Sequence, residues 1–180
     1  MNNYIIFDFD DWSIEHDCRE QLKSLKKINK NFKVTLFTVP GKTTLEMLKW
    51  AKDNENWVRL GVHGWLHNDN YECLEWTMDQ CMKVLQFCHK HGFDSVFKAP
   101  GWQISDGCYE ACRRFGMIVA DQPYNTERRP NGLFVYEVGD NSYHGHTWDC
   151  GCGNGIYEDW DNIYNKVIEY KEFKFISEAI

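Results

Sequence analysis

The stretch that decides the fold runs from Tyr4 to Trp12 and reads YIIFDFDDW. It begins as a short apolar run and ends in acids, which predicts a buried β-strand. Asp8, Asp10 and Asp11 would then lie at the carboxyl end of that strand. In parallel α/β folds the functional groups gather at the carboxyl ends of the strands. This stretch therefore predicts both a central strand and one wall of a site.

Strand-like and helix-like segments alternate along the rest of the chain. The pattern predicts strands at 33–39, 57–62, 95–97, 117–120, 133–138 and 142–146, and helices at 17–30, 43–52, 70–88, 106–115 and 158–172. Thr43 and Glu46 match a capping box at the start of the second helix. Repeated βα order is typical of a parallel sheet or barrel. The 180 residues, with no linker or repeat, predict one domain spanning 1–180.

Polar side chains follow most of the predicted strands. They are Asp10 and Asp11, His63, Lys98, Asp121, and His144 with His146. Since the carboxyl ends of parallel strands meet at one face, these residues are expected to converge there. This convergence predicts an active site.

The sequence His63-Gly-Trp-Leu-His67 places two imidazoles four residues apart, directly after a predicted strand. On one helical turn both rings reach a single ion. Catalytic zinc sites commonly use three protein ligands and leave one position open. The pair Asp10-Asp11 supplies a third ligand and, from the other carboxylate, a base that takes a proton from a metal-bound water. The alternative is a solvated acidic strand end with no chemical role.

A second histidine pair, His144-Gly-His146, follows another predicted strand. In an extended chain both rings face the same side, and one of them could protonate a leaving amine. The alternative is two surface histidines. Four tryptophans, Trp12, Trp65, Trp102 and Trp148, each lie within four residues of one of these candidates. They could stack on a sugar, or they could be part of the hydrophobic core.

These motifs resemble, in order and spacing, the polysaccharide deacetylase family, which is carbohydrate esterase family four. The matching stretches are FDD (9–11), KVTLFTVPG (33–41), RLGVHGWLH (59–67), FKAPGW (97–102), Asp121 and YHGH (143–146). The resemblance covers nearly the whole chain. It implies an α/β fold with a distorted, incomplete (β/α) barrel of about seven parallel strands.

The resemblance also implies an activity, which is metal-dependent removal of an N-acetyl, or less often O-acetyl, group from a carbohydrate or sugar-containing small molecule. Asp10 matches the general base. Asp11, His63 and His67 match the ligands of a divalent cation, usually Zn²⁺, with Co²⁺, Ni²⁺ or Mn²⁺ as alternatives. The expected partner is an acylated sugar or glycan.

The general acid of the family matches His146, or else His144. Lys98 stands where the family commonly has an Arg that pairs with the base. A lysine is a point charge without the planar guanidinium fork, so this is a real departure. Lys98, paired with Asp121, is predicted to hold Asp10 ionised.

Substrate contacts are predicted for residues beside the proposed catalytic groups. They are Trp12, Pro100, Gly101, Trp102 and Trp148. Trp12 is a further departure, because the family usually has Gly after the acid pair.

Two other functions compete with the deacetylase interpretation. In one, YIIFDFD resembles the strand end of haloacid-dehalogenase-type phosphatases, with Asp8 as nucleophile and Asp10 as acid/base. That alternative gives His63, His67 and His146 no role. In the other, the change at Lys98 marks a carbohydrate-binding barrel without turnover.

Composition narrows the possible partners. The 20 basic and 27 acidic residues give a net charge of −7, and no basic stripe is present, which argues against nucleic-acid binding. No apolar stretch reaches the ~18–20 residues needed to span a membrane. The first residues do not resemble a signal peptide, so a cytoplasmic protein is expected. In that compartment the eight cysteines are expected to be thiols and not a disulfide framework.

Overall fold

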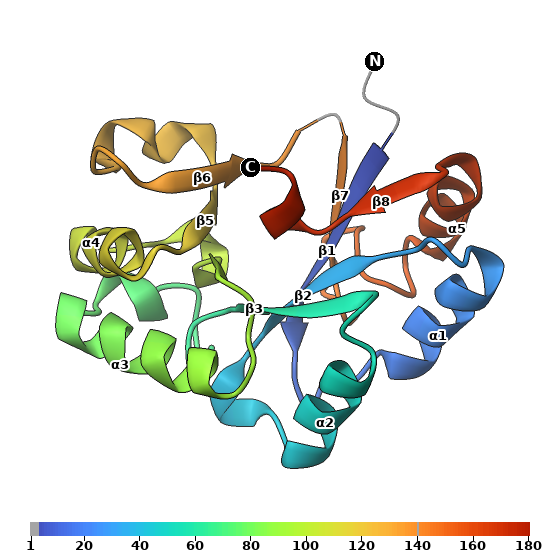
Figure 1. The fold of residues 1–180 in the computed structure, drawn as a ribbon, viewed down its shortest axis with the longest axis horizontal. Coiled ribbons are helices and arrows are strands. Elements are labelled where there is room, and N and C mark those ends of the chain that lie inside the picture. Colours follow the sequence, from blue (N-terminus) through green and yellow to red (C-terminus); the bar gives the residue numbers. More distant parts are fainter. Residues whose placement is uncertain (1–3, 140) are drawn as a thin grey trace.

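The structure is a computed structural model that describes residues 4–139 and 141–180. Its sheet contains β1 (Tyr4–Trp12), β2 (Val34–Thr38), β3 (Val58–Val62), β4 (Val96–Phe97), β5 (Ile118–Asp121), β6 (Phe134–Glu137), β7 (Ser142–His146) and β8 (Glu172–Lys174). The order is β6-β5-β4-β3-β2-β1-β7, with β8 beside the first half of β1 (Figure 1). Every pair is parallel. The predicted α/β fold with a distorted, incomplete barrel is confirmed.

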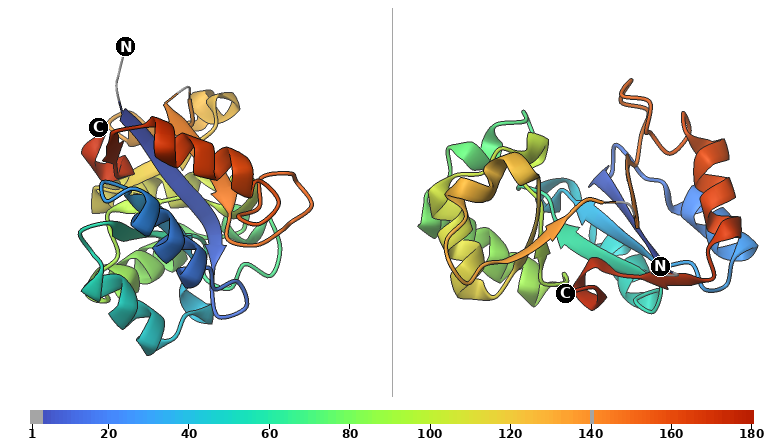
Figure 2. Two further views of the ribbon diagram at one scale, coloured as in Figure 1. Left: turned by 90° about the vertical axis from the view of Figure 1, so that its right-hand side faces the viewer. Right: turned by 90° about the horizontal axis from the view of Figure 1, so that it is seen from above.

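Helices cover the outer face of the curled sheet (Figures 1 and 2). They are α1 (Arg19–Ile28), α2 (Leu45–Asp53), α3 (Met78–Lys90), α4 (Asp106–Phe115) and α5 (Trp160–Glu169). Short 3-10 helices connect them: η1 (Pro40–Lys42), η2 (Glu72–Leu74), η3 (Pro100–Trp102), η4 (Pro123–Arg128) and η5 (Ile176–Glu178). Across the described ranges, none of the helices combines the length and apolarity that a bilayer crossing requires.

Three predicted boundaries were wrong. Helix α3 begins at Met78 and not near residue 70, because Thr77 and Gln80 form a capping box immediately before it. The cap of α2 is Thr44, whose hydroxyl accepts from the Met47 amide, and not Thr43. The last helix ends at Glu169, and the residues after it form strand β8 instead.

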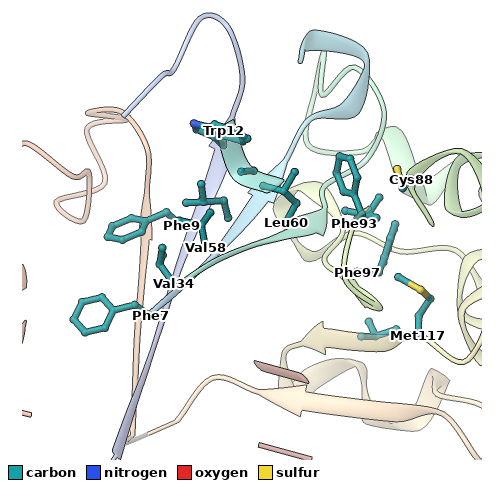
Figure 3. Close-up of a cluster of buried hydrophobic side chains, with 14 of the residues drawn as sticks. Phe7, Phe9, Trp12, Val34, Val58, Leu60, Cys88, Phe93, Phe97 and Met117 are labelled. Atoms are coloured by element: carbon teal, nitrogen blue, oxygen red, sulfur yellow. The ribbon is translucent and has the colours of Figure 1, made fainter. Parts of the chain in front are cut away.

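Strand β1 separates two environments because its side chains alternate. Ile5, Phe7 and Phe9 point outward into the large core between the sheet and the helices, part of which Figure 3 shows. Ile6 points inward and belongs to a smaller apolar cluster inside the curl of the sheet. By the period of two, Asp8 and Asp10 share the inner face with Ile6. The acids therefore begin where the inner apolar cluster ends.

The end of β1 departs from regular alternation. Phe9 pairs with Leu36 and Trp12 with Thr38, so β1 contains one residue more than β2 over this interval. Such an extra residue is a β-bulge, which redirects side chains. Asp11 lies within it at a φ of 71°, in the left-handed region that non-glycine residues rarely adopt.

Candidate active site

Asp11, His63 and His67 come together at the carboxyl end of the sheet. Asp11 Oδ1 lies 3.4 Å from His63 Nε2 and 3.1 Å from His67 Nε2. Ligand atoms around a tetrahedral zinc ion are about 3.4 Å apart, given metal–ligand bonds of about 2.0–2.2 Å. Asp11 Oδ1 is also buried and accepts no hydrogen bond. A buried, unpartnered carboxylate oxygen facing two imidazole nitrogens fits a divalent cation of the zinc type.

His63 is prepared for ligation by its own backbone surroundings. It follows β3 directly, its amide donates to the Thr38 carbonyl, and its ring is 2 % exposed. The ring Nδ1 lies 2.9 Å from the Lys98 carbonyl oxygen. Because a carbonyl can only accept, Nδ1 carries a proton, and Nε2 is the nitrogen that faces Asp11 and is available to a metal.

His67 lies on a loop and not on the predicted helical turn. Gly64 and His67 both have positive φ, at 63° and 47°. The Glu72 carboxylate organises this loop by accepting from the amides of Trp65, Leu66 and His67 at 3.1, 3.0 and 2.9 Å. Glu72 thus positions His67, and no motif in the sequence marks it for that role.

The bulge in β1 turns Asp11 toward the two histidines, and Trp148 fixes it there. The indole Nε1 of Trp148 donates to Asp11 Oδ2 at 2.8 Å. Burial alone would raise the pKa of Asp11, but its contacts with His63, His67 and Trp148 hold the pKa well below its usual range. Asp11 is therefore an anion before any cation arrives.

The charges inside the barrel favour a cation. Asp8, Asp10, Asp11 and Lys98 are all buried, so three carboxylates face one ammonium group and two negative charges are uncompensated. Burial opposes the ionisation of Asp8, yet Lys98 and His144 lower its pKa to about 2. Unpaired buried charge is unfavourable by several kcal/mol. One divalent cation would balance the cluster.

Asp10 lies between the predicted metal ligands and the second histidine pair. Its Oδ1 accepts a hydrogen bond from Lys98 Nζ at 2.8 Å. Its Oδ2 lies 3.9 Å from His63 Nε2 and 3.8 Å from His144 Nε2. The structure thus brings Lys98 to Asp10, as the resemblance implies for this position.

His144 and His146 face the same side of β7, as the extended-chain argument predicts. One ligand atom each from Asp10, His144 and His146 lie within 4.8 Å of one another. His144 Nδ1 lies 2.8 Å from Asp8 Oδ1, whereas His146 Nδ1 lies 3.0 Å from Asn154 Oδ1. The two rings therefore have different partners.

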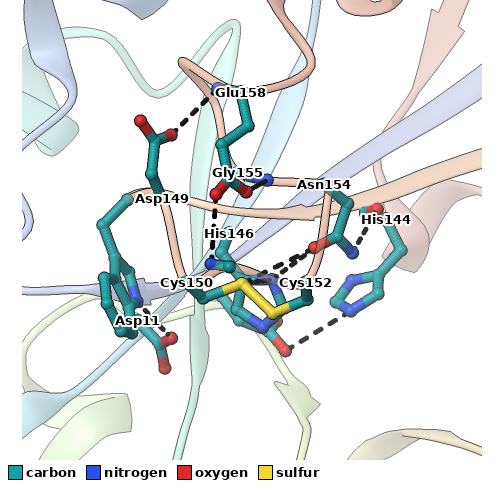
Figure 4. Close-up of a disulfide and its surroundings, with 12 residues drawn as sticks. Asp11, His144, His146, Asp149, Cys150, Cys152, Asn154, Gly155 and Glu158 are labelled. Atoms are coloured by element: carbon teal, nitrogen blue, oxygen red, sulfur yellow. Dashed lines mark hydrogen bonds and ion pairs between the residues drawn. A yellow bond between two sulfur atoms is a disulfide. The ribbon is translucent and has the colours of Figure 1, made fainter.

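The loop after β7 corrects the expectation that all cysteines are thiols. Cys150 and Cys152 form a disulfide beside His146, whose Nδ1 is 3.5 Å from Cys150 Sγ (Figure 4). The other six cysteines are free and buried, in line with the prediction. Two cysteines separated by one glycine lie close enough to bond wherever the chain turns.

Asp121 does not pair with Lys98, so that prediction was wrong. Its carboxylate accepts hydrogen bonds from Tyr109, Asn125 and Arg129 at 2.6, 2.8 and 3.0 Å. The Arg129 guanidinium neutralises it, and Lys98 has Asp8 and Asp10 instead. Asp121 belongs to a separate polar cluster that anchors η4.

The five predicted substrate contacts divide into supporting and accessible residues. Trp12 is fully buried in the outer core (Figure 3), so its prediction as a substrate contact was wrong. The β-bulge explains the error, because it returns Trp12 to the helix side of the sheet. Pro100 is also buried and packs against Gly64, and Gly101 packs against Asn70, so both support the His67 loop.

The two accessible aromatics flank the site from opposite sides. The Trp102 ring lies 4.8 Å from Lys98 Nζ and 5.4 Å from the His144 ring. The Trp148 ring stacks on His16 at 4.6 Å. A hollow of about 220 Å³ opens next to Asp11 and is lined by residues that include these stacked rings. It can hold one small polar group beside the predicted metal position.

Sequence comparison identifies no relative. The chain matches no protein-family model, and no curated protein is significantly similar to it.

Solved structures, in contrast, share the fold across nearly the whole chain. A peptidoglycan N-acetylglucosamine deacetylase has a TM-score of 0.64 at 13% identity, covering 98% of this chain and 87% of that one. A family 4 acetyl xylan esterase from Clostridium thermocellum, in complex with a cobalt ion, has 0.62 at 14%, covering 97% and 89%. A CE4 family pseudoenzyme from Bacillus anthracis has 0.61 at 17%, covering 98% and 64%.

The fold is therefore that of carbohydrate esterase family four, the polysaccharide deacetylases. At 13–17% identity these similarities establish the fold alone. They include esterase, deacetylase and pseudoenzyme, so the activity of this chain has to be argued from its own side chains.

Proposed function

We propose that this protein is a metal-dependent hydrolase that removes the acetyl group from an N-acetylated, or less often O-acetylated, carbohydrate. The observation that carries the proposal is the convergence of Asp11, His63 and His67 around one unpartnered carboxylate oxygen. Asp10 lies beside this triad as a base. The three solved structures described above support this substrate class, since two of them are an acetyl xylan esterase and a peptidoglycan N-acetylglucosamine deacetylase.

The side chains divide the reaction between them. A divalent cation held by Asp11, His63 and His67 would polarise the acyl oxygen and lower the pKa of water to about 7. Asp10 takes a proton from the attacking water, whose oxygen bonds to the acyl carbon. The carbon–nitrogen bond then breaks while an imidazole of the second histidine pair protonates the amine. The proton on Asp10 returns to that imidazole through solvent.

Lys98 keeps Asp10 ready for this role. Its ammonium group is fully buried and donates to Asp10 Oδ1, which leaves Oδ2 facing the histidines. Burial lowers the pKa of Lys98, but Asp10 and Asp8 raise it above its usual value, so the ammonium stays charged. The lysine thus supplies the positive charge that an arginine would otherwise provide, and it reaches Asp10 through one hydrogen bond and not through a two-pronged guanidinium contact.

The test measures metal and turnover on the same samples. Protein purified without added metal is expected to contain about one divalent ion per chain and to release acetate from some members of a panel of N-acetyl and O-acetyl sugars. Asp10→Asn should retain the ion and lose about 10²–10⁴-fold in kcat, whereas His63→Ala should lose the ion. The exposed Asp53→Asn serves as the control. Full occupancy in His63→Ala, or normal turnover in Asp10→Asn, would refute the assignment.

A second candidate is a carbohydrate-binding barrel without turnover. The shared fold of the Bacillus anthracis pseudoenzyme favours it. Bound metal and measurable affinity for acetylated sugars, with no acetate released from any of them, would establish this function instead.

The phosphatase alternative has no support in the geometry. Its nucleophile would be Asp8, whose side chain is fully buried and paired with Lys98 and His144. A phosphoryl group could not reach that carboxylate without breaking both contacts.

A further inference from the structure

Asp8 joins the proposed base to one of the two candidate acids. It lies two residues before Asp10 on the inner face of β1, with no exposed surface. Lys98 Nζ donates to both Asp8 Oδ1 and Asp10 Oδ1. His144 Nδ1 lies 2.8 Å from Asp8 Oδ1 and 3.1 Å from Lys98 Nζ. These contacts make one buried network across β1, β4 and β7.

Whether His144 Nδ1 carries a proton determines which hydrogen bonds form in this network. A carboxylate only accepts hydrogen bonds and an ammonium group only donates them. The contact with Asp8 therefore requires a proton on Nδ1, whereas a hydrogen bond from Lys98 requires Nδ1 to be bare. The Asp8 distance is the shorter of the two, and Lys98 already has two carboxylate acceptors. The geometry thus favours the tautomer in which Nδ1–H donates to Asp8.

We infer that His144 is the general acid of the proposed reaction and that Asp8 is its positioning residue, an inference that rests on the proposed function. With Nδ1–H held by Asp8, the Nε2 edge of His144 faces Asp10 Oδ2 at 3.8 Å. In the acid form, the proton on Nε2 passes to the amine as the carbon–nitrogen bond breaks, and Nδ1–H keeps its hydrogen bond to Asp8. A carboxylate behind an imidazole fixes its tautomer and stabilises its cationic form in this way.

His146 lacks an equivalent arrangement. Its Nδ1 faces the neutral Asn154 side chain and a disulfide sulfur, and within residues 4–139 and 141–180 no carboxylate lies at that nitrogen (Figure 4). Asp121, which matches one of the motifs of the family, is neutralised by Arg129 in its own cluster. In the part of the chain that the structure describes, Asp8 is the acidic residue that contacts Nδ1 of one of the two candidate acids, His144.

The experiment compares two leaving groups, because a general acid matters only where the leaving group needs a proton. Deacetylation of a short N-acetylglucosamine oligomer releases an amine, which needs a proton. Deacetylation of 4-nitrophenyl acetate releases a stable phenolate, which does not. Asp8→Asn and His144→Gln are expected to reduce kcat for the amide by about 10²–10⁴-fold and for the aryl ester by less than about tenfold. KM and metal content should stay unchanged. Asp94→Asn, the same change at the opposite end of the barrel, is the matched control.

Two outcomes would overturn the inference. An equal loss on both substrates in Asp8→Asn would mean that Asp8 only supports the structure. A loss confined to the amide in His146→Gln, with His144→Gln near normal, would assign the acid to His146.

A second measurement does not depend on turnover. Imidazole ¹⁵N NMR of the wild-type protein should show His144 protonated at Nδ1, and Asp8→Asn should shift this signal. A bare Nδ1 in the wild type would refute the Asp8–His144 pair. If the wild type hydrolyses neither substrate but His144 carries Nδ1–H, the proposed function fails while the pair stands.

Discussion

Each of the two histidine pairs begins with His-Gly at or after the end of a strand, but the rings of the two pairs contact different groups. His63 and His67 come from a strand end and a loop, yet both aim Nε2 at one oxygen of Asp11. His144 and His146 come from one strand and share a face, yet their Nδ1 atoms bind different partners, Asp8 and Asn154. The first pair meets at one oxygen of Asp11, whereas the second pair approaches Asp10 and has its Nδ1 atoms held by two different partners.

The pairs differ in the group that contacts the Nδ1 atom of the ring. The backbone carbonyl behind His63 accepts from Nδ1, which leaves Nε2 as the nitrogen that can bind a metal. The carboxylate behind His144 accepts from Nδ1–H, which leaves Nε2 as the nitrogen that can pass a proton to a leaving group. The same side chain is thus prepared for metal or for proton chemistry by the second partner, and the spacing of the histidines does not distinguish the two.

The largest effect should come from removing a histidine from the converging pair. His67→Ala removes one of three ligands, and the metal affinity is expected to fall by more than about 100-fold, because even changes behind a ligand cost 10–100-fold. His146→Ala, the matched change in the other pair, should keep the metal. Metal content after dialysis, read by elemental analysis, measures both. Loss of the ion in His146→Ala but not in His67→Ala would reverse the assignment of the pairs.

A smaller effect is expected from the carboxylate that shapes the first loop. Glu72→Gln replaces an oxygen that accepts from backbone amides with an NH₂ group that cannot, so the His67 loop should loosen. The expected result is a metal affinity about 10–100-fold weaker, measured by competition with a chelator. The exposed Glu75→Gln and the second-pair change Asn154→Ala should leave the affinity unchanged. An unaltered affinity in Glu72→Gln would show that the loop holds its shape without this carboxylate.

The smallest effect concerns the indole behind Asp11. Trp148→Phe keeps an aromatic ring but removes the hydrogen bond to Asp11 Oδ2. Because Trp148 is partly exposed, water can replace that donor, and an affinity loss of about fivefold, or roughly 1 kcal/mol, is expected. The chelator titration applies again, with Trp76→Phe as the control. A loss as large as that in Glu72→Gln would mean that the tryptophan also orders the backbone at Asp11.

The sequence predicted the sheet because apolar strands and amphipathic helices alternate along it, and local pattern is enough for that. Strand β8 was missed because only Phe173 of its three residues is buried, so it carries no period. The start of α3 was misplaced because Leu74 fits the helical spacing of Cys81, Leu85 and Cys88, although it lies in η2. The signal for β8 lies in its pairing with β1, whereas the signal for the start of α3 is local, in the capping box of Thr77 and Gln80.

The structure brings Asp11, His63 and His67 together, as the pattern predicted, but the sequence did not indicate the contacts that hold them there. Regular alternation would send Asp10 and Asp11 to opposite faces, and only the bulge against β2 brings Asp11 to His63. Glu72 accepts from backbone amides five to seven residues before it, and Asp8 contacts a histidine 136 residues away, and no motif marks either role. The Cys150–Cys152 bond was missed because the expected compartment favoured thiols.

Strand β8 has a consequence for how the molecule can be attached to something else. It pairs with Tyr4–Ile6, the end of β1 farthest from Asp10, so Tyr4 and the C-terminal residues lie away from the predicted metal position. Figure 1 shows the start of β1 and the C-terminal residues on that side. A tag, an immobilising surface or a neighbouring domain joined at either end would leave the mouth of the barrel open to a polymer as long as a glycan chain.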